Sequence, residues 1–411
     1  MNTNIQIKSA LEMLITEVKP KSPVSLNLVD ALGYVLAEDI FSPLNIPPFD
    51  RSPLDGFALR ACDTLNATKE QPTTFKVIDF APAGKPSTKI LGPYQAIRIM
   101  TGAKIPDGAD LIVPFEETEF TEEWVKVFKT YKSNSNITFK GEDIKKGQRV
   151  LVKGDLINPP EIGILASIGK NEVLVYDRPK VAILSTGDEL VDVNQPLEEG
   201  KIPNSNSYTI AALVKRAGGI PYILPHCPDH LEKITKEISS TLKWADILVT
   251  TGGVSVGDKD YVMEAFQRIC DKFLFWKVKM KPGTPITAAK YKDKLMIGLS
   301  GNPAAAFITF EIFVKPIIKK FRGLEKIYPL ELESTLLSNF TKVRNQNRFV
   351  RAITYYDSGN FYTKLPDSHS SGVISSLTKV NSLFFIPAGA GPFTEGQKIK
   401  VQLLEGEDLL P

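Results

Sequence analysis

The chain reads Thr251-Gly252-Gly253-Val254-Ser255-Val256-Gly257-Asp258-Lys259-Asp260-Tyr261 between an apolar run, residues 245–250, and a segment that opens a helix. Glycine lets the backbone approach a ligand closely, and the free amides of a helix start favour an anion. The turn therefore indicates phosphate recognition. Ordinary strand-to-helix geometry is the alternative explanation for the same glycines.

Two other turns have the same character. Leu184-Ser185-Thr186-Gly187-Asp188-Glu189-Leu190 follows the apolar run 181–184, and Gly298-Leu299-Ser300-Gly301-Asn302-Pro303 follows the apolar segment 294–297. Each precedes a segment with helical spacing. Three such turns are typical of the carboxyl edge of an open parallel sheet, where ligands bind. We expect one ligand site at this edge.

Composition restricts the class of protein. The 411 residues are 43% hydrophobic and 24% charged, which is typical of a globular protein of roughly two to four domains. A net charge of +3 without a Lys/Arg block argues against nucleic-acid or membrane binding, and no apolar run reaches membrane-spanning length. The first 20 residues suggest an amphipathic helix rather than a signal peptide. Three dispersed cysteines favour a reducing compartment, and we expect the cytoplasm.

The pattern of elements changes along the chain. Residues 42–57 are proline-rich and extended, and residues 73–138 contain short alternating runs broken by Gly and Pro, as in a small β-rich domain. Strands and helices alternate between residues 180 and 321, which predicts a parallel sheet covered by helices. Short strands beyond residue 328 predict a further small β domain.

One run of lysines also points to an anion. Lys277, Lys279 and Lys281 alternate within residues 275–281, so a strand would present them on one face. Three ammonium groups on one face repel each other without a counter-anion, although a solvated strand face is the alternative. By contrast, His226, Cys227 and His230 stand between a strand and a helix start without a further ligand cluster, which argues against a metal site there.

Several motifs, taken in order, closely resemble the MoeA family of molybdopterin molybdenumtransferases, to which the gephyrin E domain also belongs. They are Phe49-Asp50-Arg51-Ser52-Pro53-Leu54-Asp55-Gly56-Phe57-Ala58, Met100-Thr101-Gly102-Ala103, the turns at 185–190 and 251–261, and Lys281-Pro282-Gly283-Thr284-Pro285. The similarity runs from about residue 7 to the C-terminus.

The resemblance implies an elongated homodimer with four domains in each subunit. These would be an elongated N-terminal helix/strand domain (residues 1–48 with 139–176), a β-rich domain (49–138), a molybdopterin-binding, doubly wound parallel-sheet α/β domain (177–325) and a small C-terminal β-barrel (326–411). The implied activity belongs to molybdenum cofactor biosynthesis: molybdate is inserted into adenylylated molybdopterin and AMP is released in a Mg²⁺-dependent step.

The resemblance also implies roles for individual residues. Glu189, Lys277 and Lys281 would be catalytic, and Asp55, Thr101 and Asp143 would act on the site of the partner subunit. Glu189, Asp246 and Asp260 would hold the Mg²⁺ ion. The turns would bind substrate through Thr186, Gly187, Asp188, Gly252, Gly253, Val254, Ser255, Gly257, Ser300, Gly301, Asn302 and Pro303, with Asp188 chiefly shaping its turn.

Molybdate would be held by Arg351 with Ser371 in the C-terminal domain. Two departures from the family pattern concern this region: Ser300 and Ala305 replace a proline and a serine that are usual there, and Thr284 stands where a lysine is common. We expect the first to alter the molybdate contacts and the second to remove one charge from the phosphate region.

Two other functions are compatible with parts of the sequence. One is a catalytically silent molybdopterin-binding scaffold, and the other is a nucleotide pyrophosphatase that shares only the α/β domain. Retention of the carboxylates Glu189, Asp246 and Asp260 argues against the scaffold, and the two β domains argue against the pyrophosphatase. Contacts with the molybdopterin adenylyltransferase and with molybdoenzyme acceptors are further expectations from the resemblance.

Overall fold

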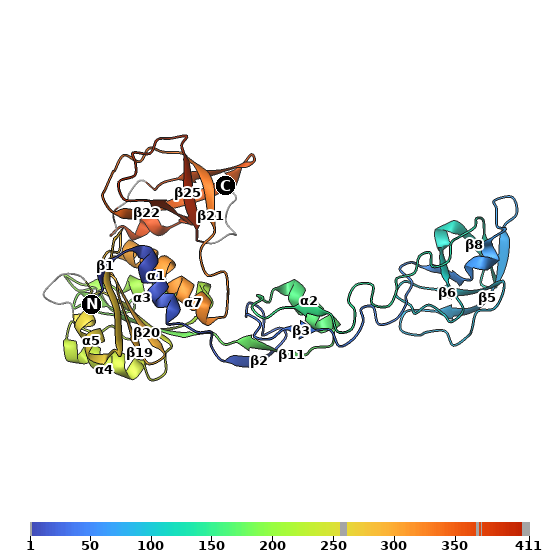
Figure 1. Cartoon of the computed structure of the whole chain (residues 1–411), viewed down its shortest axis with the longest axis horizontal. Coiled ribbons are helices and arrows are strands. Elements are labelled where there is room, and N and C mark those ends of the chain that lie inside the picture. The colour runs from blue at the N-terminus through green and yellow to red at the C-terminus, as the bar shows by residue number, and fades with distance from the viewer. Residues whose placement is uncertain (1, 255–260, 367–369, 371, 405–411) are drawn as a thin grey trace.

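The computed structural model describes residues 2–254, 261–366, 370 and 372–404. The molecule is elongated (Figure 1). An α/β domain and the C-terminal β domain lie together at one end, a β-rich domain lies at the other, and a narrow linker domain joins them. Within the described residues, no helix is long and apolar enough to cross a membrane.

A seven-stranded mixed sheet forms the α/β domain, in the order β1-β17-β19-β20-β16-β12-β15. Its strands are β1 (Thr3–Ile5), β12 (Lys180–Ser185), β15 (Ile220–Ile223), β16 (Ile247–Thr251), β17 (Lys272–Val278), β19 (Thr287–Tyr291) and β20 (Lys294–Leu299). All neighbouring pairs are parallel except those that β19 makes. The predicted doubly wound parallel sheet is confirmed, with one antiparallel strand added.

Helices cover both faces of this sheet, as the continuous apolar strands require. Val181 and Ile183 of β12 point into one core, and Ala182 and Leu184 point into the other. The helices are α1 (Ile7–Thr16), α3 (Ser205–Arg216), α4 (Leu231–Thr241), α5 (Tyr261–Ile269), α6 (Pro303–Thr309) and α7 (Lys315–Phe321), with a π-helical segment at Phe310–Val314 between the last two.

The first helix belongs to this domain. Strand β1 pairs in parallel with β17, and the α1 residues Ala10 and Leu14 are fully buried in the core beside β17. The structure therefore puts residues 3–16 with the α/β domain, whereas the sequence led us to group them with the rest of residues 1–48. The amphipathic pattern identified a helix, but it does not say which sheet the helix covers.

The linker domain consists of two narrow ribbons and a helix. Strand β2 (Pro23–Asn27) pairs with β11 (Glu172–Tyr176), and β3 (Ile40–Phe41) pairs with β10 (Arg149–Leu151). Helix α2 (Pro159–Ser167) begins with a capping box formed by Asn158 and Glu161, which satisfies free amides at its start. The chain thus crosses the linker once on its way out and once on its way back.

Six strands form the sheet of the β-rich domain, in the order β7-β4-β6-β5-β9-β8. They are β4 (Gly56–Leu59), β5 (Thr73–Ala81), β6 (Gln95–Ile99), β7 (Leu111–Pro114), β8 (Thr118–Phe120) and β9 (Trp124–Val127). Separate apolar clusters pack against its two faces. Short 3₁₀ turns at Ala61–Thr64 and Phe115–Glu117 complete it.

The C-terminal domain is a closed barrel. Its strands are β21 (Glu331–Leu336), β22 (Asn347–Asp357), β23 (Asn360–Lys364), β24 (Ser382–Ile386) and β25 (Lys398–Leu403), and pairing of β22 with β24 closes the ring. A short strand from the α/β domain, β18 (Met280–Lys281), adds to β22. The predicted small barrel is confirmed, and β18 joins it to the α/β domain.

Candidate functional site

The strand order places a topological switch point between β12 and β16. The chain runs from β12 to β15 on one side, and then returns to β16 and β20 on the other. In such sheets the crevice at the carboxyl ends of the two central strands is where ligands bind. The turns after β12 and β16 are the two glycine-bearing turns that the sequence singled out.

The three turns meet at this edge. The Thr186 amide donates to the Thr251 carbonyl at 2.9 Å, and the Gly252 amide donates to the Leu299 carbonyl at 3.2 Å. The Asn206 side chain of α3 donates to the Gly301 carbonyl at 2.7 Å. Backbone of one turn is therefore tied to backbone of the next, and the predicted residues Thr186, Gly252 and Gly301 lie together.

Glycine is required where the turns touch. Gly252 has a φ of +95°, and a Cβ there would lie 2.4 Å from the Thr186 carbonyl oxygen. Gly253 has a φ of +62°, and a Cβ there would lie 2.8 Å from Val262 Cγ2. A side chain at either position would push the turns apart. Val254 is buried in the core, so only its backbone could reach a ligand.

A buried hydroxyl network fixes the strand ends beneath the turns. Ser185 Oγ lies 3.0 Å from Asn204 Oδ1, 2.7 Å from Ser207 Oγ and 2.8 Å from Thr251 Oγ1, and all four residues are buried. The sequence analysis missed Asn204 and Ser207, although an Asn-Ser-Asn-Ser run before a helical segment is a cap signal. Thr186 Oγ1 is also buried and makes no hydrogen bond to any described residue.

The two adjacent carboxylates of the first turn differ in their contacts. Asp188 Oδ1 accepts a hydrogen bond from the Asp229 amide at 3.1 Å, so Asp188 shapes the turn. Glu189 is exposed, and its carboxylate lies over Gly187, since a Cβ on Gly187 would be 2.5 Å from Glu189 Oε2. Glu189 is thus the carboxylate of this turn that is free to face a cation.

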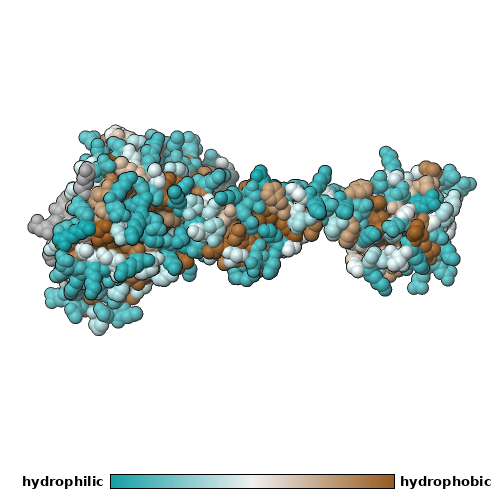
Figure 2. Space-filling model, turned by 60° about the horizontal axis from the view of Figure 1, so that its bottom comes forward, coloured by the Kyte–Doolittle hydropathy of each residue, from teal (hydrophilic) through white to brown (hydrophobic). Residues whose placement is uncertain are grey.

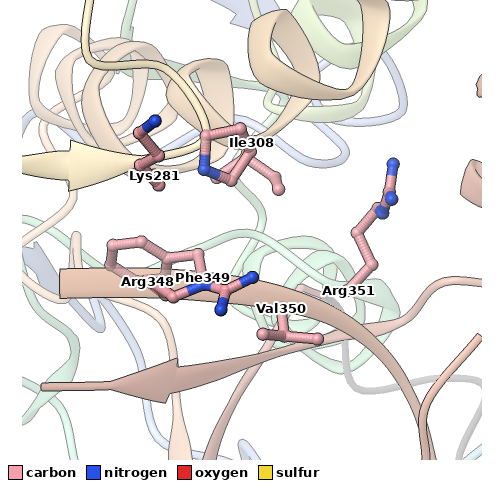
Figure 3. Close-up of a pocket in the computed structure, with 7 residues that line it drawn as sticks. Lys281, Ile308, Arg348, Phe349, Val350 and Arg351 are labelled. Carbon is pink, nitrogen blue, oxygen red and sulfur yellow. The ribbon is translucent and has the colours of Figure 1, made fainter. Parts of the chain in front are cut away.

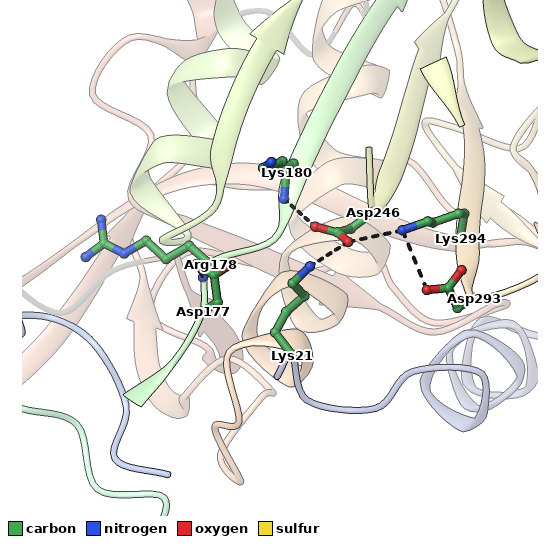
Figure 4. Close-up of polar contacts among 7 residues, drawn as sticks. All are labelled: Lys21, Asp177, Arg178, Lys180, Asp246, Asp293 and Lys294. Atoms are coloured by element: carbon green, nitrogen blue, oxygen red, sulfur yellow. Dashed lines mark hydrogen bonds and ion pairs between the residues drawn. The ribbon is translucent and has the colours of Figure 1, made fainter. Parts of the chain in front are cut away.

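Asp246 is not at this edge, and our assignment of it as a metal ligand was wrong. It precedes β16 and so lies at the amino end of the sheet, about 20 Å from Gly252 at the usual rise of a strand. It is buried and accepts hydrogen bonds from Lys21 Nζ at 2.8 Å and from the Lys180 amide at 2.8 Å, with Lys294 Nζ at 3.5 Å (Figure 4). Asp246 fastens the linker to the sheet.

A cationic cavity lies where the α/β domain meets the barrel. Its volume is about 160 Å³, and Figure 3 shows Lys281 reaching it from the α/β domain while Arg348 and Arg351 reach it from β22. Arg351 is only 3% exposed, and its Nη2 donates to the Ser370 carbonyl at 3.1 Å. Burial lowers the pKa of both arginines, which is the cost of keeping these charges away from water. We call this cavity the oxyanion pocket.

The oxyanion pocket and the three turns share helix α6. Ser300, Gly301 and Asn302 form the turn before α6, and Pro303 is its first residue. Ile308, five residues further on and about 7.5 Å along the helix axis, lines the oxyanion pocket. From the barrel side, a Cβ on Gly372 would lie 3.8 Å from Asn302 Oδ1. Helix α6, whose residues from Ala304 to Thr309 are buried, therefore connects the sheet edge to the pocket through the core.

Only part of the lysine run reaches the pocket. Val278 and Met280 are buried while Lys279 and Lys281 are exposed, as the alternation predicted. However, Lys277 has a φ of +64°, so the run is not one regular strand, and Lys277 Nζ lies 3.8 Å from the centre of the Trp276 ring. Among these lysines, Lys281 is the one that lines the oxyanion pocket.

Asp55, Thr101 and Asp143 lie away from the α/β domain of the same subunit. Asp55 Oδ1 accepts hydrogen bonds from the Thr101 amide at 2.7 Å and from Thr101 Oγ1 at 2.8 Å. These two bonds hold the pKa of Asp55 below its usual value, so the carboxylate stays ionised. Asp143 is exposed in the loop that leads back to the linker. In Figure 1, the β-rich domain and the carboxyl edge of the α/β sheet lie on opposite sides of the linker domain.

Some of the predicted residues lie outside the described part of the chain. They are Ser255, Gly257, Asp260 and Ser371. Of the carboxylates assigned to a cation, Glu189 alone is described at the carboxyl edge. The described residues contain no group of three or more His, Cys, Asp or Glu side chains that could hold a metal ion.

The fold and the site define a multidomain anion-binding protein built on an α/β sheet. Residues 5–169 match the MoeA N-terminal region (domain I and II), residues 182–320 match a probable molybdopterin binding domain, and residues 333–404 match the MoeA C-terminal region (domain IV). The chain belongs to the MoeA family.

Relatives match it over nearly the whole length. A molybdopterin molybdenumtransferase of Staphylococcus aureus is 39% identical over 98% of this chain and 96% of its own length, and that of Bacillus subtilis is 41% identical over 93% and 90%. A crystal structure of the molybdopterin biosynthesis MoeA protein from Pyrococcus horikoshii aligns with a TM-score of 0.83 at 30% identity, covering 97% of this chain and all of that one. Similarity is thus not confined to the α/β domain.

Replacing Gly252 by alanine should disrupt the site. Both the positive φ and the contact with the Thr186 carbonyl oppose a Cβ, so we expect a loss of about 2–4 kcal/mol in unfolding free energy and at least tenfold weaker binding of adenylylated molybdopterin. Gly147 is the matched control, because it has a φ of +85° but open space around it. Gly147→Ala should lose about 1 kcal/mol and bind normally. Equal behaviour of the two variants, measured by urea denaturation and calorimetry, would contradict the packing role.

Replacing Asp246 by asparagine should reduce the free energy of unfolding but leave the rate of turnover unchanged. Lys21 and Lys294 would lose their anionic partner, so we expect a decrease of about 1–3 kcal/mol in unfolding free energy. Asp293→Asn is the control, since the Asp293 side chain is 80% exposed and contacts only Lys294, at 3.5 Å; it should change stability by less than about 0.5 kcal/mol. A folded Asp246→Asn protein that has lost its response to Mg²⁺ would restore the metal assignment.

Proposed function

We propose that this protein catalyses the insertion of molybdate into adenylylated molybdopterin, with release of AMP, as a molybdopterin molybdenumtransferase. The observation that carries the proposal is that α6 joins a glycine-lined sheet edge at its start to a cationic pocket at Ile308. Relatives that carry this name match the chain over both features.

Each of these two features suits one substrate. The glycine-bearing turns and the close backbone packing at the switch point suit the diphosphate of the adenylylated pterin, because such turns bind phosphate without adding charge. The oxyanion pocket suits molybdate, a tetrahedral dianion, with Arg351 and Lys281 as its cations. Ser371 is retained as a proposed ligand beside Arg351.

The protein would contribute chiefly position and charge. In the overall reaction, the two dithiolene thiols bind molybdenum, and their two protons leave with one oxygen of molybdate as water; another water adds across the phosphoanhydride to release AMP. Lys277 and Lys281 would offset the negative charge of the bound phosphates and of the transition state. Lys277 would have to leave the Trp276 ring to do so.

We further propose that Mg²⁺ is shared between the protein and the substrate. Mg²⁺ commonly takes one or two carboxylates and completes its shell with water and substrate phosphates, so a three-carboxylate cage is not required. Glu189 fits this pattern, since it is exposed beside the glycine turn and has no ion-pair partner among the described residues. Asp260 is retained as a second proposed ligand. When bound, the ion would neutralise charge on the phosphoanhydride.

We propose that the active form is a homodimer whose partner subunit completes the site. Figure 2 shows hydrophobic residues gathered over the linker domain, in the middle of the molecule. Exposed large hydrophobic side chains there include Val29 (79%), Leu32 (49%) and Phe41 (54%). A patch of this kind on a narrow linker supports burial against a second subunit. Asp55, Thr101 and Asp143 would then reach the partner's sheet edge.

The cytoplasm is the proposed location, where the reduced cysteines would be stable. Transient contacts with a molybdopterin adenylyltransferase, which would supply the substrate, and with molybdoenzyme acceptors are also proposed. Both would limit exposure of a labile pterin to water.

An insertion assay tests the function. Purified protein incubated with adenylylated molybdopterin, Mg²⁺ and molybdate should release AMP and reconstitute a cofactor-free molybdoenzyme. Lys281→Met should weaken binding of adenylylated molybdopterin by about tenfold in calorimetry, because one cation near the phosphates is lost. Lys279→Met is the control, since Lys279 is exposed on the same segment outside the oxyanion pocket. Binding without AMP release by the native protein would indicate a silent scaffold instead.

Mixing two inactive variants tests the dimer. If the site is composite, a dimer of one Asp55→Asn subunit and one Glu189→Gln subunit contains one intact site. Random reassociation of equal amounts should then restore about a quarter of native activity, because about half of the dimers are mixed and each has one working site of two. If Asp55 acts within its own subunit, no mixed dimer has an intact site. Activity that stays at the level of the separate variants would contradict the cross-subunit role.

A further inference from the structure

The oxyanion pocket contains a third cation that the sequence did not single out. Arg348 lines it together with Lys281 and Arg351, and no carboxylate is among the described residues that line it. Figure 3 shows that Arg348 and Arg351 come from the same strand, β22, and Lys281 comes from β18, which pairs with β22. A small cavity that three cations line, with no acid among its described lining residues, favours an anion.

The backbone pairing holds two of these cations side by side. Strand β18 runs parallel to β22 with Lys281 directly in register with Arg348. Like charges in register on neighbouring strands repel each other and destabilise the pair. Neither Lys281 nor Arg348 forms an ion pair with a described residue that would relieve the repulsion. A ligand with negative charge between them would do so.

Other contacts fix the guanidinium of Arg348 without neutralising it. Its Nη1 lies 3.4 Å from the Lys342 carbonyl oxygen, and its Cζ lies 5.0 Å from the centre of the Phe340 ring. Both contacts orient the group and leave its full charge. Partial burial and the nearby Arg344 lower the pKa of Arg348.

We propose that Arg348 is an oxyanion-binding residue that makes the pocket select doubly charged over singly charged tetrahedral anions; this inference rests on the proposed function. Arg348 adds a positive charge, whose attraction is twice as strong for an anion of charge −2 as for an anion of the same shape with charge −1. Arg348 thus selects anions by their charge, while the shape of the pocket selects them by their size.

Molybdate and perrhenate provide the test, because they are tetrahedral oxyanions of similar size with charges of −2 and −1. Coulomb energy is proportional to the charge of the anion, so the fold-loss for molybdate should be the square of that for perrhenate. We expect Arg348→Gln to weaken the binding of molybdate by about tenfold and that of perrhenate by about threefold, measured by calorimetry at low ionic strength, where screening is small. Arg348→Lys, which keeps the charge, should stay within about threefold of the native protein for both.

Lys400→Gln is the matched control, since Lys400 is exposed on β25 and outside the oxyanion pocket; it should leave both affinities unchanged. Equal losses for the two anions, or none, in a folded Arg348→Gln protein would overturn the inference. So would a native protein that binds perrhenate as tightly as molybdate, which needs no variant to measure. Arg351→Gln separates the two proposals: if it too leaves molybdate binding intact, the pocket itself is not the molybdate site and the proposed function loses its support.

Discussion

The contact between Gly252 and the Thr186 carbonyl is the constraint on which the site depends. At the switch point, the turns after β12 and β16 approach so closely that a single added carbon would lie 2.4 Å from the carbonyl oxygen. This approach requires that the strand ends below be fixed, and the hydroxyl network around Ser185 fixes them. It also allows the third turn, at Gly301, to lie against the second. Backbone of three separate turns is thereby packed together at one edge of the sheet.

The second half of the site depends on a pairing between domains. Strand β18 leaves the α/β domain and joins the barrel, so that Lys281 and Arg348 become neighbours although 67 residues separate them in the sequence (348 − 281). Helix α6 connects this junction to the third turn. Movement of the barrel relative to the α/β domain would therefore change the charge around the oxyanion pocket as well as its size. Binding of the anion and docking of the two domains are linked through the same residues.

Features that depend on a local sequence pattern were predicted correctly. Features that depend on pairing between distant segments of the chain were missed. Glycine turns after apolar runs located the edge of the sheet, because strand ends in a parallel sheet lie together. Asp246 was misassigned because a carboxylate next to an apolar run looks the same at either end of a strand, and its lysine partners come from residues 21 and 294. Arg348 was missed because only the pairing of β22 with β18 brings it to Lys281. Residues 3–16 were assigned to the wrong domain for the same reason.

That early segment has a consequence for how the protein is made. Strand β1 pairs with β17, so Thr3 can enter the sheet only after Trp276 has been synthesised. At about 5–20 residues per second, the ribosome needs about 15–55 seconds to supply it. During this time the linker and the β-rich domain have already emerged, whereas the apolar side of α1 has no sheet to cover. The α/β domain therefore closes only after most of the chain has been translated.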